Sequence, residues 1–511
     1  MNRAFENIRQ RVQRTPMVTI LPAIAIGILL ADGIGMPLWL AALLLAASLL
    51  MAWLWRHPLS ALLFIIVVGA TSLSLRRSTE RIPPHLTEME IILNHIISED
   101  DSHRTYQADL VAYNDMGAVR RSNATIRAIT SSAAACSMGE RLVVRTMVHP
   151  YDLGTTFGEY MAHKGVAGYV RINADNILQR QNYFSLGVWL QEKAKQRIDL
   201  LDLRPSTKGI ATAISIGERS QITHTERRHY TLSGGAHLLA VSGLHVGFVF
   251  VFINLLLLPL AALRNGTLWR TLLSIGFIWC YAAMAALSPS VVRAATMFTL
   301  FQLSSIFTSR SVSLNTLCAT ATLMLLWDGR MLYDIGFLLS LLAVVAIIEW
   351  ATPMLGQLKS SDEDKLRRLR YMLQHPVRGR LRQISRGLGR WIFTGVTVSF
   401  VANIATLPLA SLHFGEGSLW GIVVGFAMVT LCSISTTIIL TWTLIPIPFL
   451  APATKFIVES CVEAMNSIAE WCADTSFLNF TLHLNTSSCM LIYTALLLLT
   501  LALWSIKSNE K

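Results

Sequence analysis

Charged residues are scarce in this sequence. Only 14% of its 511 residues are Asp, Glu, Lys or Arg, whereas 53% are hydrophobic and the mean hydropathy is +0.49. A soluble globular domain carries about 25% charged residues, so this composition excludes an ordinary soluble protein. Apolar runs long enough to cross a bilayer recur along the chain. The sequence therefore predicts a polytopic α-helical membrane protein.

Sequence patterns for catalysis, metal binding and nucleotide hydrolysis are also absent. The seven cysteines are scattered and form no Cys-x-x-Cys or Cys/His spacing. No Gly-x-x-x-x-Gly-Lys-[Ser/Thr] phosphate-binding loop occurs. Ser242 and His245 are close in sequence, but they lack the strand–turn–helix context and the orienting acid of a hydrolase. We therefore predict no catalytic residue, no metal ligand and no cofactor, and we expect that the protein is not an enzyme.

Twelve apolar runs predict about 12 membrane spans. They lie at about 17–36, 37–55, 59–75, 235–263, 268–287, 290–307, 312–327, 331–353, 391–413, 419–446, 450–473 and 488–506. Cytoplasmic loops are rich in Lys and Arg. Met1–Pro16 has four arginines against one glutamate, and Lys359–Arg390 has ten Lys and Arg against three acids. We expect both segments, and both chain ends, in the cytoplasm.

Residues 80–185 differ in composition and are expected outside the cytoplasm. Alternating polar and apolar residues at 105–113, 119–130, 141–150 and 166–172 predict β-strands of a small five-stranded barrel. Ten Lys and Arg face eleven Asp and Glu between Arg81 and Ser185, so no basic groove is indicated. Cys136 is the only cysteine here, which excludes an internal disulfide. Its aromatic residues, Tyr106, Tyr113, Tyr151, Phe157, Tyr160 and Tyr169, are expected mainly in the core.

The region 186–230 links this β domain to the remaining spans. Asn182–Leu203 has the period of an amphipathic helix lying at the membrane surface. Thr207–Gly217 is rich in small residues and is either a re-entrant segment or a packed helix. Glu218–His229 has the composition of a solvated loop. If this stretch instead lines an outer mouth, Arg219, Arg227 and Arg228 would bind phosphate groups.

The stretch Gly234–Gly247, GGAHLLAVSGLHVG, is the most unusual part of the apolar sequence. It begins a long apolar run, yet it contains His237, Ser242, Gly243 and His245. Polar groups at membrane depth face a cavity, a partner helix or a solute path, and glycine weakens the helix there. One interpretation is a broken polar helix beside an aqueous path. The other is a contact between closely packed helices, with the histidines hydrogen-bonded.

Two further charges lie within the predicted spans. Arg293 has apolar residues on both sides, and Asp334 begins another span at a similar outer depth. An unpaired arginine in the bilayer is costly, so it must pair with an acid or reach water. We predict that Arg293 and Asp334 form an ion pair. The alternative is that each side chain reaches the outer interface separately.

Several of these segments resemble one membrane protein family. HLLAVSGLHV, residues 237–246, closely resembles the signature of the ComEC competence proteins, which are DNA translocation channels. The longer segment Ala213–Val246 fits too, with Gly-Glu-Arg where Gly-Asp-Arg is usual. SPSVVRAATMF (Ser288–Phe298) and LYDIGFLLSLLAVVAI (Leu332–Ile347) are similar to two further family segments. In this family an OB-fold-like domain occupies the place of residues 80–185, and 149–170 is similar to its closing motif.

The resemblance implies a function and a set of partners. It implies an inner-membrane channel that conducts transforming DNA, as a single strand, into the cytoplasm during natural competence. DNA would come from a receptor and pilus components outside, and a cytoplasmic ATPase or helicase would pull it. The His-x-His-x-Asp-His run of the family's metallo-β-lactamase-type domain is absent, so we expect a short form that depends on a separate nuclease. Contact with membrane lipid is implied, and a homo-oligomer is left open.

The predicted organisation has four parts. They are N-terminal spans (1–79), the extracytoplasmic OB-fold-like β domain (80–185), the linker region (186–230) and a channel domain (231–511) with a basic cytoplasmic loop at 356–390. Two alternatives belong to other functional classes. A secondary transporter or channel for a small anionic solute should show two related halves, and no internal repeat is evident. A membrane-anchored scaffold would leave the polar element and Arg293 without a role.

Overall fold

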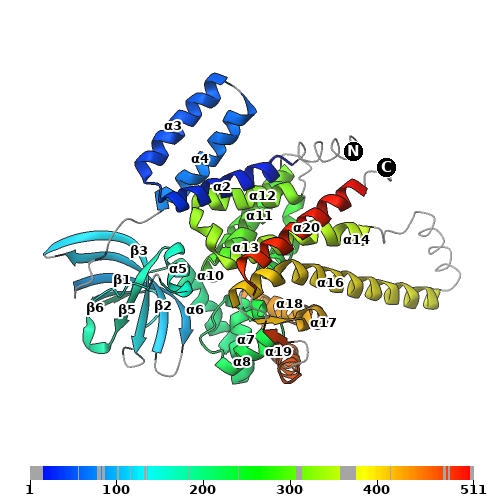
Figure 1. Cartoon of the computed structure of the whole chain (residues 1–511). Helices are drawn as coiled ribbons and strands as arrows, with labels where there is room; N and C mark the ends of the chain where they lie inside the picture. Colours follow the sequence, from blue (N-terminus) through cyan, green and yellow to red (C-terminus); the bar gives the residue numbers. More distant parts are fainter. Residues whose placement is uncertain are drawn as a thin grey trace.

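A computed structural model describes most of the chain as a β domain that lies against a helical bundle (Figure 1). The described residues are 15–55, 57–76, 82, 87–99, 103–115, 117–131, 134, 136–152, 154–182, 184–239, 241–306, 313–356, 376–414, 416–475, 479–481 and 484–506. The predictions for the basic segment 1–14 and for most of the basic loop, 357–375, lie outside the described residues.

The β domain is built on one sheet of six strands. They are β1 (Thr87–Glu99), β2 (His103–Asp115), β3 (Ala118–Ser131), β4 (Glu140–Thr146), β5 (Val166–Ile172) and β6 (Ile177–Asn182), in the order β5-β3-β2-β1-β4-β6. Neighbouring strands are antiparallel, except that β3 and β5 are parallel. Beyond β4, His149 and Tyr169 exchange two backbone hydrogen bonds of 2.8 and 2.9 Å. This contact draws β5 toward the β4 side and curls the sheet.

The structure corrects the sequence prediction for this domain in two respects. It has six strands rather than five, because β6 pairs with the outer edge of β4. Tyr106 and Tyr113 are in the core, at 0% and 3% exposure, but Tyr151, Phe157 and Tyr169 lie outside it. These three belong to the outward face of β5 and to the segment before and within α5 (Thr156–His163), a short helix between β4 and β5.

The rest of the described chain is helical. Its α-helices are α2 (Met17–Ile34), α3 (Leu38–Trp55), α4 (Pro58–Arg76), α6 (Leu186–Asp199), α7 (Pro205–Ile216), α8 (His224–Leu232), α9 (Gly243–Leu256), α10 (Gly266–Met284), α11 (Pro289–Ile306), α12 (Ser313–Trp327), α13 (Ile335–Ala346), α14 (Thr352–Gly356), α16 (Pro376–Phe414), α17 (Trp420–Val423), α18 (Gly425–Leu444), α19 (Ala451–Asp474) and α20 (Thr486–Ile506). Short helical turns are η2 (Ala174–Asn176), η3 (Ala236–Leu239), η4 (Leu258–Ala262), η5 (Gly329–Tyr333), η6 (Ile347–Ala351) and η7 (Pro448–Leu450), and a small hairpin pairs β7 (Glu416–Ser418) with β8 (Asn479–Thr481).

Among the described residues, five helical stretches are long and apolar enough to cross a membrane. They are 17–34, 58–75, 335–355, 384–413 and 425–444. Shorter apolar helices lie at 38–54, 243–256, 290–303, 314–327 and 486–500. Large apolar side chains such as Trp39 and Trp53, at 69% and 68% exposure, cover the α3 surface and suit contact with lipid. A membrane protein with several spans is thus supported, and the total of twelve stays a prediction.

Helix α2 crosses α4 at very short range. A Cβ atom added to Gly27 would lie 1.9 Å from the carbonyl oxygen of Ile66, and one added to Gly69 would lie 2.3 Å from that of Ile24. Each glycine therefore admits the backbone of the other helix. This is the small-residue packing that membrane helices use in place of a hydrophobic driving force.

The linker region is part of the bundle rather than a peripheral segment. Ile210, Ala213 and Ile214 of α7 have no exposed surface and pack with residues of α18 and α19. Thr207–Gly217 thus contains a packed helix, and a re-entrant position in the membrane stays a prediction. The predicted amphipathic helix is present as α6, which also buries its face in the bundle. The expectation of a loop holds for 218–223 but is wrong for 224–229, because a capping box between Thr223 and Glu226 starts α8.

Candidate polar site in the helical bundle

The stretch Gly234–Gly247 is a broken helix in the structure. The short turn η3 ends at Leu239, Val241 and Ser242 are non-helical, and α9 begins at Gly243. Ser242 is extended, with φ −106° and ψ 170°, as expected for the residue that precedes a helix. The sequence prediction of a break is therefore confirmed.

His245 closes the break by bonding at both ring nitrogens. The Ser242 backbone N–H donates to Nδ1 over 2.9 Å, and the Ser242 hydroxyl lies 2.9 Å from the same atom. Since Nδ1 accepts, the ring proton is on Nε2, which lies 3.1 Å from Cys432 Sγ of α18. His245 is 1% exposed. The interpretation that it faces an aqueous path is wrong for this conformation.

The two flanking glycines mediate the contact between α9 and α11. A Cβ atom at Gly243 would lie 3.4 Å from the Ala294 Cβ and 3.9 Å from Arg293 Nη2. One at Gly247 would lie 3.5 Å from the ring of Phe298. Both distances are ordinary van der Waals contacts, so a Cβ atom fits at either position, and any further side-chain atoms would extend toward α11. In this conformation the element matches the helix-packing alternative. His237, by contrast, is exposed, and its Nδ1 lies 3.1 Å from the Gly234 carbonyl oxygen.

Arg293 is buried in the bundle next to this element, at 3% exposure. Its guanidinium donates to the Phe337 carbonyl oxygen over 3.4 Å and to the hydroxyl groups of Ser290 and Ser340. Asp334 does not pair with it. The structure instead places Asp334 Oδ2 2.8 Å from Lys164 Nζ of the β domain, so the predicted Arg293–Asp334 ion pair is wrong.

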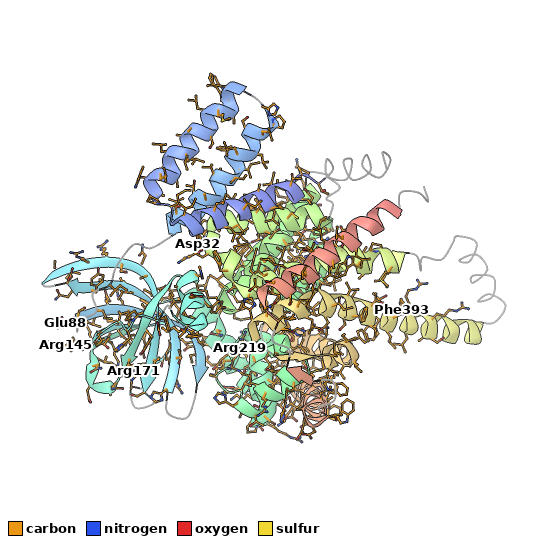
Figure 2. All side chains as sticks on the ribbon, in the orientation of Figure 1. Asp32, Glu88, Arg145, Arg171, Arg219 and Phe393 are labelled. Atoms are coloured by element: carbon orange, nitrogen blue, oxygen red, sulfur yellow. The ribbon has the colours of Figure 1, made fainter. Side chains whose placement is uncertain are left out.

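Asp334 joins the β domain to the bundle. Its Oδ1 accepts from the Phe337 backbone N–H over 2.9 Å and so caps α13. Nearby, the His163 ring stacks on Tyr333 with centroids 4.4 Å apart, and the Tyr333 hydroxyl donates to Asp32 of α2 over 2.8 Å. Figure 2 places Asp32 where the bundle meets the β domain. Burial lowers the pKa of Lys164, but the Asp334 carboxylate outweighs it and raises that pKa overall.

The three arginines predicted at an outer mouth lie before and on α8. Arg227 and Arg228 are exposed on α8, and Arg219 precedes it. None of the three has a carboxylate partner within the described part of the chain. The surrounding protein and the positive charge of Arg227 lower the pKa of Arg219, so these two guanidinium groups repel each other. Figure 2 shows Arg219 between the β domain and the bundle.

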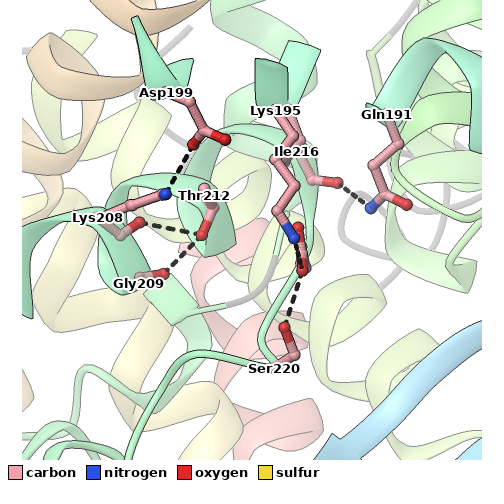
Figure 3. Close-up of polar contacts among 9 residues, drawn as sticks. Gln191, Lys195, Asp199, Lys208, Gly209, Thr212, Ile216 and Ser220 are labelled. Carbon is pink, nitrogen blue, oxygen red and sulfur yellow. Dashed lines mark hydrogen bonds and ion pairs between the residues drawn. The ribbon is translucent and has the colours of Figure 1, made fainter. Parts of the chain in front are cut away.

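Sequence reasoning missed Glu218, the acid of the Gly-Glu-Arg segment. Its side chain is only 4% exposed, and its Oε1 lies 2.7 Å from Lys195 Nζ and 2.8 Å from the Ser220 hydroxyl. Figure 3 labels both partners, Lys195 and Ser220. The other oxygen, Oε2, has no hydrogen-bond partner among the described residues. The sequence signal for Glu218 is its position in the Gly-Glu-Arg segment, directly before Arg219. Glu218 fixes the start of the arginine-bearing segment against α6.

Comparisons with known proteins place these features in one family. A family model described as "Competence protein" matches residues 214–507, which is more than half of the chain and includes the polar element, Arg293 and Asp334. The chain is 26% identical over 227 residues to "ComE operon protein 3" of Bacillus subtilis (strain 168), a match that covers 44% of this chain and 25% of that protein. No solved structure matches.

A second relative is an "Uncharacterized protein" of Aquifex aeolicus (strain VF5), 33% identical over 161 residues. The match covers 31% of this chain and 36% of that protein. The chain therefore spans between a quarter and about a third of the length of the two curated relatives it matches.

Proposed function

This chain belongs to the competence protein family, and we propose that it is the inner-membrane channel through which transforming DNA, as a single strand, passes into the cytoplasm. The observation that supports the proposal best is the broken polar element, which lies inside the matched region. Non-helical backbone at membrane depth is tolerated only where it is enclosed by protein or lines a path. The break at Val241–Ser242 is therefore the place where a path can form with the least loss of helix hydrogen bonds.

The described conformation corresponds to a sealed channel. A pore wide enough for a nucleic acid strand would dissipate ion gradients if it stayed open without DNA. The contact between His245 and Cys432 joins α9 to α18 across the break, and His245 is buried there. Opening needs this contact to part, after which His245, Ser242 and His237 supply weak donors to a passing phosphate chain. Neutral histidine can take up a proton beside phosphate without holding it permanently.

The parts around the element fit the same proposal. We assign the β domain to the outer side of the membrane, in a topology of about 12 spans with both chain ends inside. The β1-β2-β3 meander, the parallel β3–β5 pair and the antiparallel β1–β4 pair support the OB-fold-like domain implied by the family. Arg219, Arg227 and Arg228 have no carboxylate partner within the described part of the chain, and we assign their guanidinium groups to phosphate binding at the outer mouth.

Partners must supply the remaining steps. The sequence has no phosphate-binding loop, so we assign the driving force to a cytoplasmic ATPase or helicase. We assign delivery to a DNA receptor and pilus components outside, and removal of the second strand to a separate nuclease. The protein itself positions and conducts the strand.

The test compares two substitutions at Gly243 in a transformable host. Gly243→Ala adds one carbon in ordinary contact with Ala294 and should import DNA normally. Gly243→Leu adds atoms beyond that contact and should abolish DNA import while surface DNA binding stays normal. Import is measured as nuclease-protected DNA for each folded molecule in the membrane. A stable, abundant Gly243→Leu protein that imports DNA at the normal rate would overturn the proposal.

His245 provides an independent test of the same path. His245→Ala should impair import, whereas His245→Gln keeps a donor toward Cys432 and should impair it less. Equal impairment, in step with loss of protein from the membrane, would indicate that His245 acts only in packing.

A further inference from the structure

The β domain carries an aromatic surface made mostly of residues that the sequence predicts to lie mainly in the core, and this surface is separate from the polar site in the bundle. Its rings are those of His149, Tyr151, Phe157 and Tyr169. The His149 and Tyr169 rings are stacked with centroids 5.1 Å apart, and Tyr151 lies 5.6 Å from Tyr169 and 5.7 Å from Phe157. Phe157 is 51% exposed, and the other three are partly exposed. We call these four residues, with the two arginines described next, the ring surface.

Two guanidinium groups complete the ring surface. The Arg127 Cζ lies 5.6 Å from the centroid of the Phe157 ring, and the Arg171 Cζ lies 5.9 Å from that of Tyr169. Arg127 and Tyr169 are register partners on β3 and β5, so the sheet itself holds cation and ring side by side. Neither arginine has a carboxylate partner among the described residues. Elsewhere in the domain arginines do pair, as Arg120 does with Asp115 at 3.1 Å.

The geometry that holds the ring surface comes from the backbone. His149 and Tyr169 exchange their two backbone hydrogen bonds, which fixes the stacked rings at the seam where β5 approaches the chain beyond β4. Thr155 caps α5 by accepting from the Gly158 N–H over 3.0 Å, and this places Phe157 in the first turn of the helix. The backbone that carries the His149, Phe157 and Tyr169 rings is therefore held by hydrogen bonds that need no ligand.

We propose that the ring surface binds single-stranded nucleic acid, with bases stacked on Phe157 and Tyr169 and phosphates at Arg127 and Arg171. Sequence-independent single-strand sites combine exposed aromatic rings with positively charged side chains, and the guanidinium groups here have no carboxylate partner among the described residues. A double helix keeps its bases stacked inside and offers no ring faces to such a surface. This inference rests on the proposed function, because it assigns the outer domain a direct role in holding the same strand.

The ring surface also lies close to the bundle. Helix α5 carries Phe157 near its start and ends at His163, which stacks on Tyr333. Eight residues of α-helix span about 12 Å. A nucleic acid strand bound to the ring surface would thus lie about 12 Å, the length of α5, from the contact between the β domain and η5. The ring surface is where the strand is held before it reaches the bundle.

The experiment measures how tightly a fluorescent oligothymidylate binds the full-length protein in detergent. The oligonucleotide has about 20 nucleotides, which is more than the roughly 4–16 that one OB-fold covers. Tyr169→Ala and Phe157→Ala should each weaken binding about fivefold to a hundredfold. Arg171→Ala should weaken it and lower the slope of log affinity against log salt by about 0.7. A duplex of the same length should bind much more weakly than the single strand.

Arg145 provides the matched control. It is an exposed arginine on β4, opposite Glu88 in the sheet, and it is not one of the six residues of the ring surface. Arg145→Ala removes the same charge and should leave affinity unchanged. Equal losses for Arg145→Ala and Arg171→Ala would indicate diffuse attraction and overturn the inference, as would normal binding by Tyr169→Ala.

Two measurements keep the test independent of folding and of the channel. Light-induced crosslinking of an iodouridine-containing oligonucleotide to the wild-type protein should modify Phe157, Tyr169 or Tyr151, and crosslinks confined to the bundle would overturn the inference. The Gly243→Leu protein should bind the oligonucleotide normally. If the ring-surface variants bind the oligonucleotide as well as the Gly243→Leu protein does, the inference fails. The channel proposal is unaffected by that result, because it is tested by DNA import. If ring-surface variants lose binding but Gly243→Leu imports DNA normally, the channel proposal fails separately.

Discussion

The ion pair between Lys164 and Asp334 makes a quantitative prediction about the contact between the β domain and the bundle. Its two side chains are 34% and 12% exposed, and Nζ and Oδ2 are 2.8 Å apart. Fully exposed pairs contribute about 0.2–1 kcal/mol, whereas hydrogen bonds to charged groups contribute about 1.5–3 kcal/mol. Because Lys164 is one-third exposed, we expect a coupling energy of about 1 kcal/mol.

The substitutions can separate the ion pair from the helix cap. Asp334→Asn keeps an oxygen for the Phe337 N–H and removes only the charge, whereas Asp334→Ala also loses the cap, at a further cost of about 1 kcal/mol. A double-mutant cycle of Lys164→Gln with Asp334→Asn, measured as the free energy of unfolding in detergent, isolates the coupling. A cycle of Arg293→Gln with Asp334→Asn should give a smaller value, since Arg293 bonds to Ser290, Ser340 and Phe337 instead.

Two results would refute this reasoning. One is a Lys164–Asp334 coupling indistinguishable from zero within the roughly 0.3–0.5 kcal/mol error of such cycles. The other is a larger coupling between Arg293 and Asp334. The pH dependence is a further check. The pKa of Lys164 is raised in the folded protein, so its contribution is fully present below the unfolded lysine pKa of about 10.4. It should be lost only as the pH rises above that value, and stability between pH 7 and 9 should not depend on it.

Three further predictions concern helix packing, topology and the β domain. Gly27→Leu should lower the free energy of unfolding by about 1–3 kcal/mol, because its added atoms meet the Ile66 backbone. Gly33→Ala on the same helix has open space around the added carbon and should raise the free energy of unfolding slightly. Equal effects of the two substitutions would contradict the close crossing of α2 and α4. A cysteine at Ser361, which lies outside the described residues, should resist labelling by impermeant reagents in intact cells, and strong labelling from outside would contradict the topology. Reductant should leave the melting temperature of the protein unchanged, since Cys136 is buried and is the only cysteine of the β domain; a decrease would indicate a disulfide.

Local patterns were enough to predict most of the elements. Spans, the β domain and the break at Ser242–Gly243 depend on hydropathy, alternation and glycine, which are properties of neighbouring residues. The helix at His224–Leu232 has a local signal, the capping box of Thr223 and Glu226, but its density of charged residues is equally typical of a loop. Strand β6 was missed because ILQRQN, residues 177–182, is polar except at its start, as suits an edge strand.

Only the tertiary structure decided which side chains meet. Arg293 and Asp334 lie at similar depth by sequence, but Asp334 forms its ion pair with Lys164, which is 170 residues earlier in the chain. This pair forms because α5 contacts η5. The sequence favours a His245 side chain that faces water, whereas in the structure Cys432 of α18 contacts the Nε2 atom of His245. The ring surface likewise forms only where the segment beyond β4 meets β5. The local sequence determines which side chains of a segment can be buried. Which partners those side chains meet depends on contact energies between segments far apart in the chain, and no local pattern contains these energies.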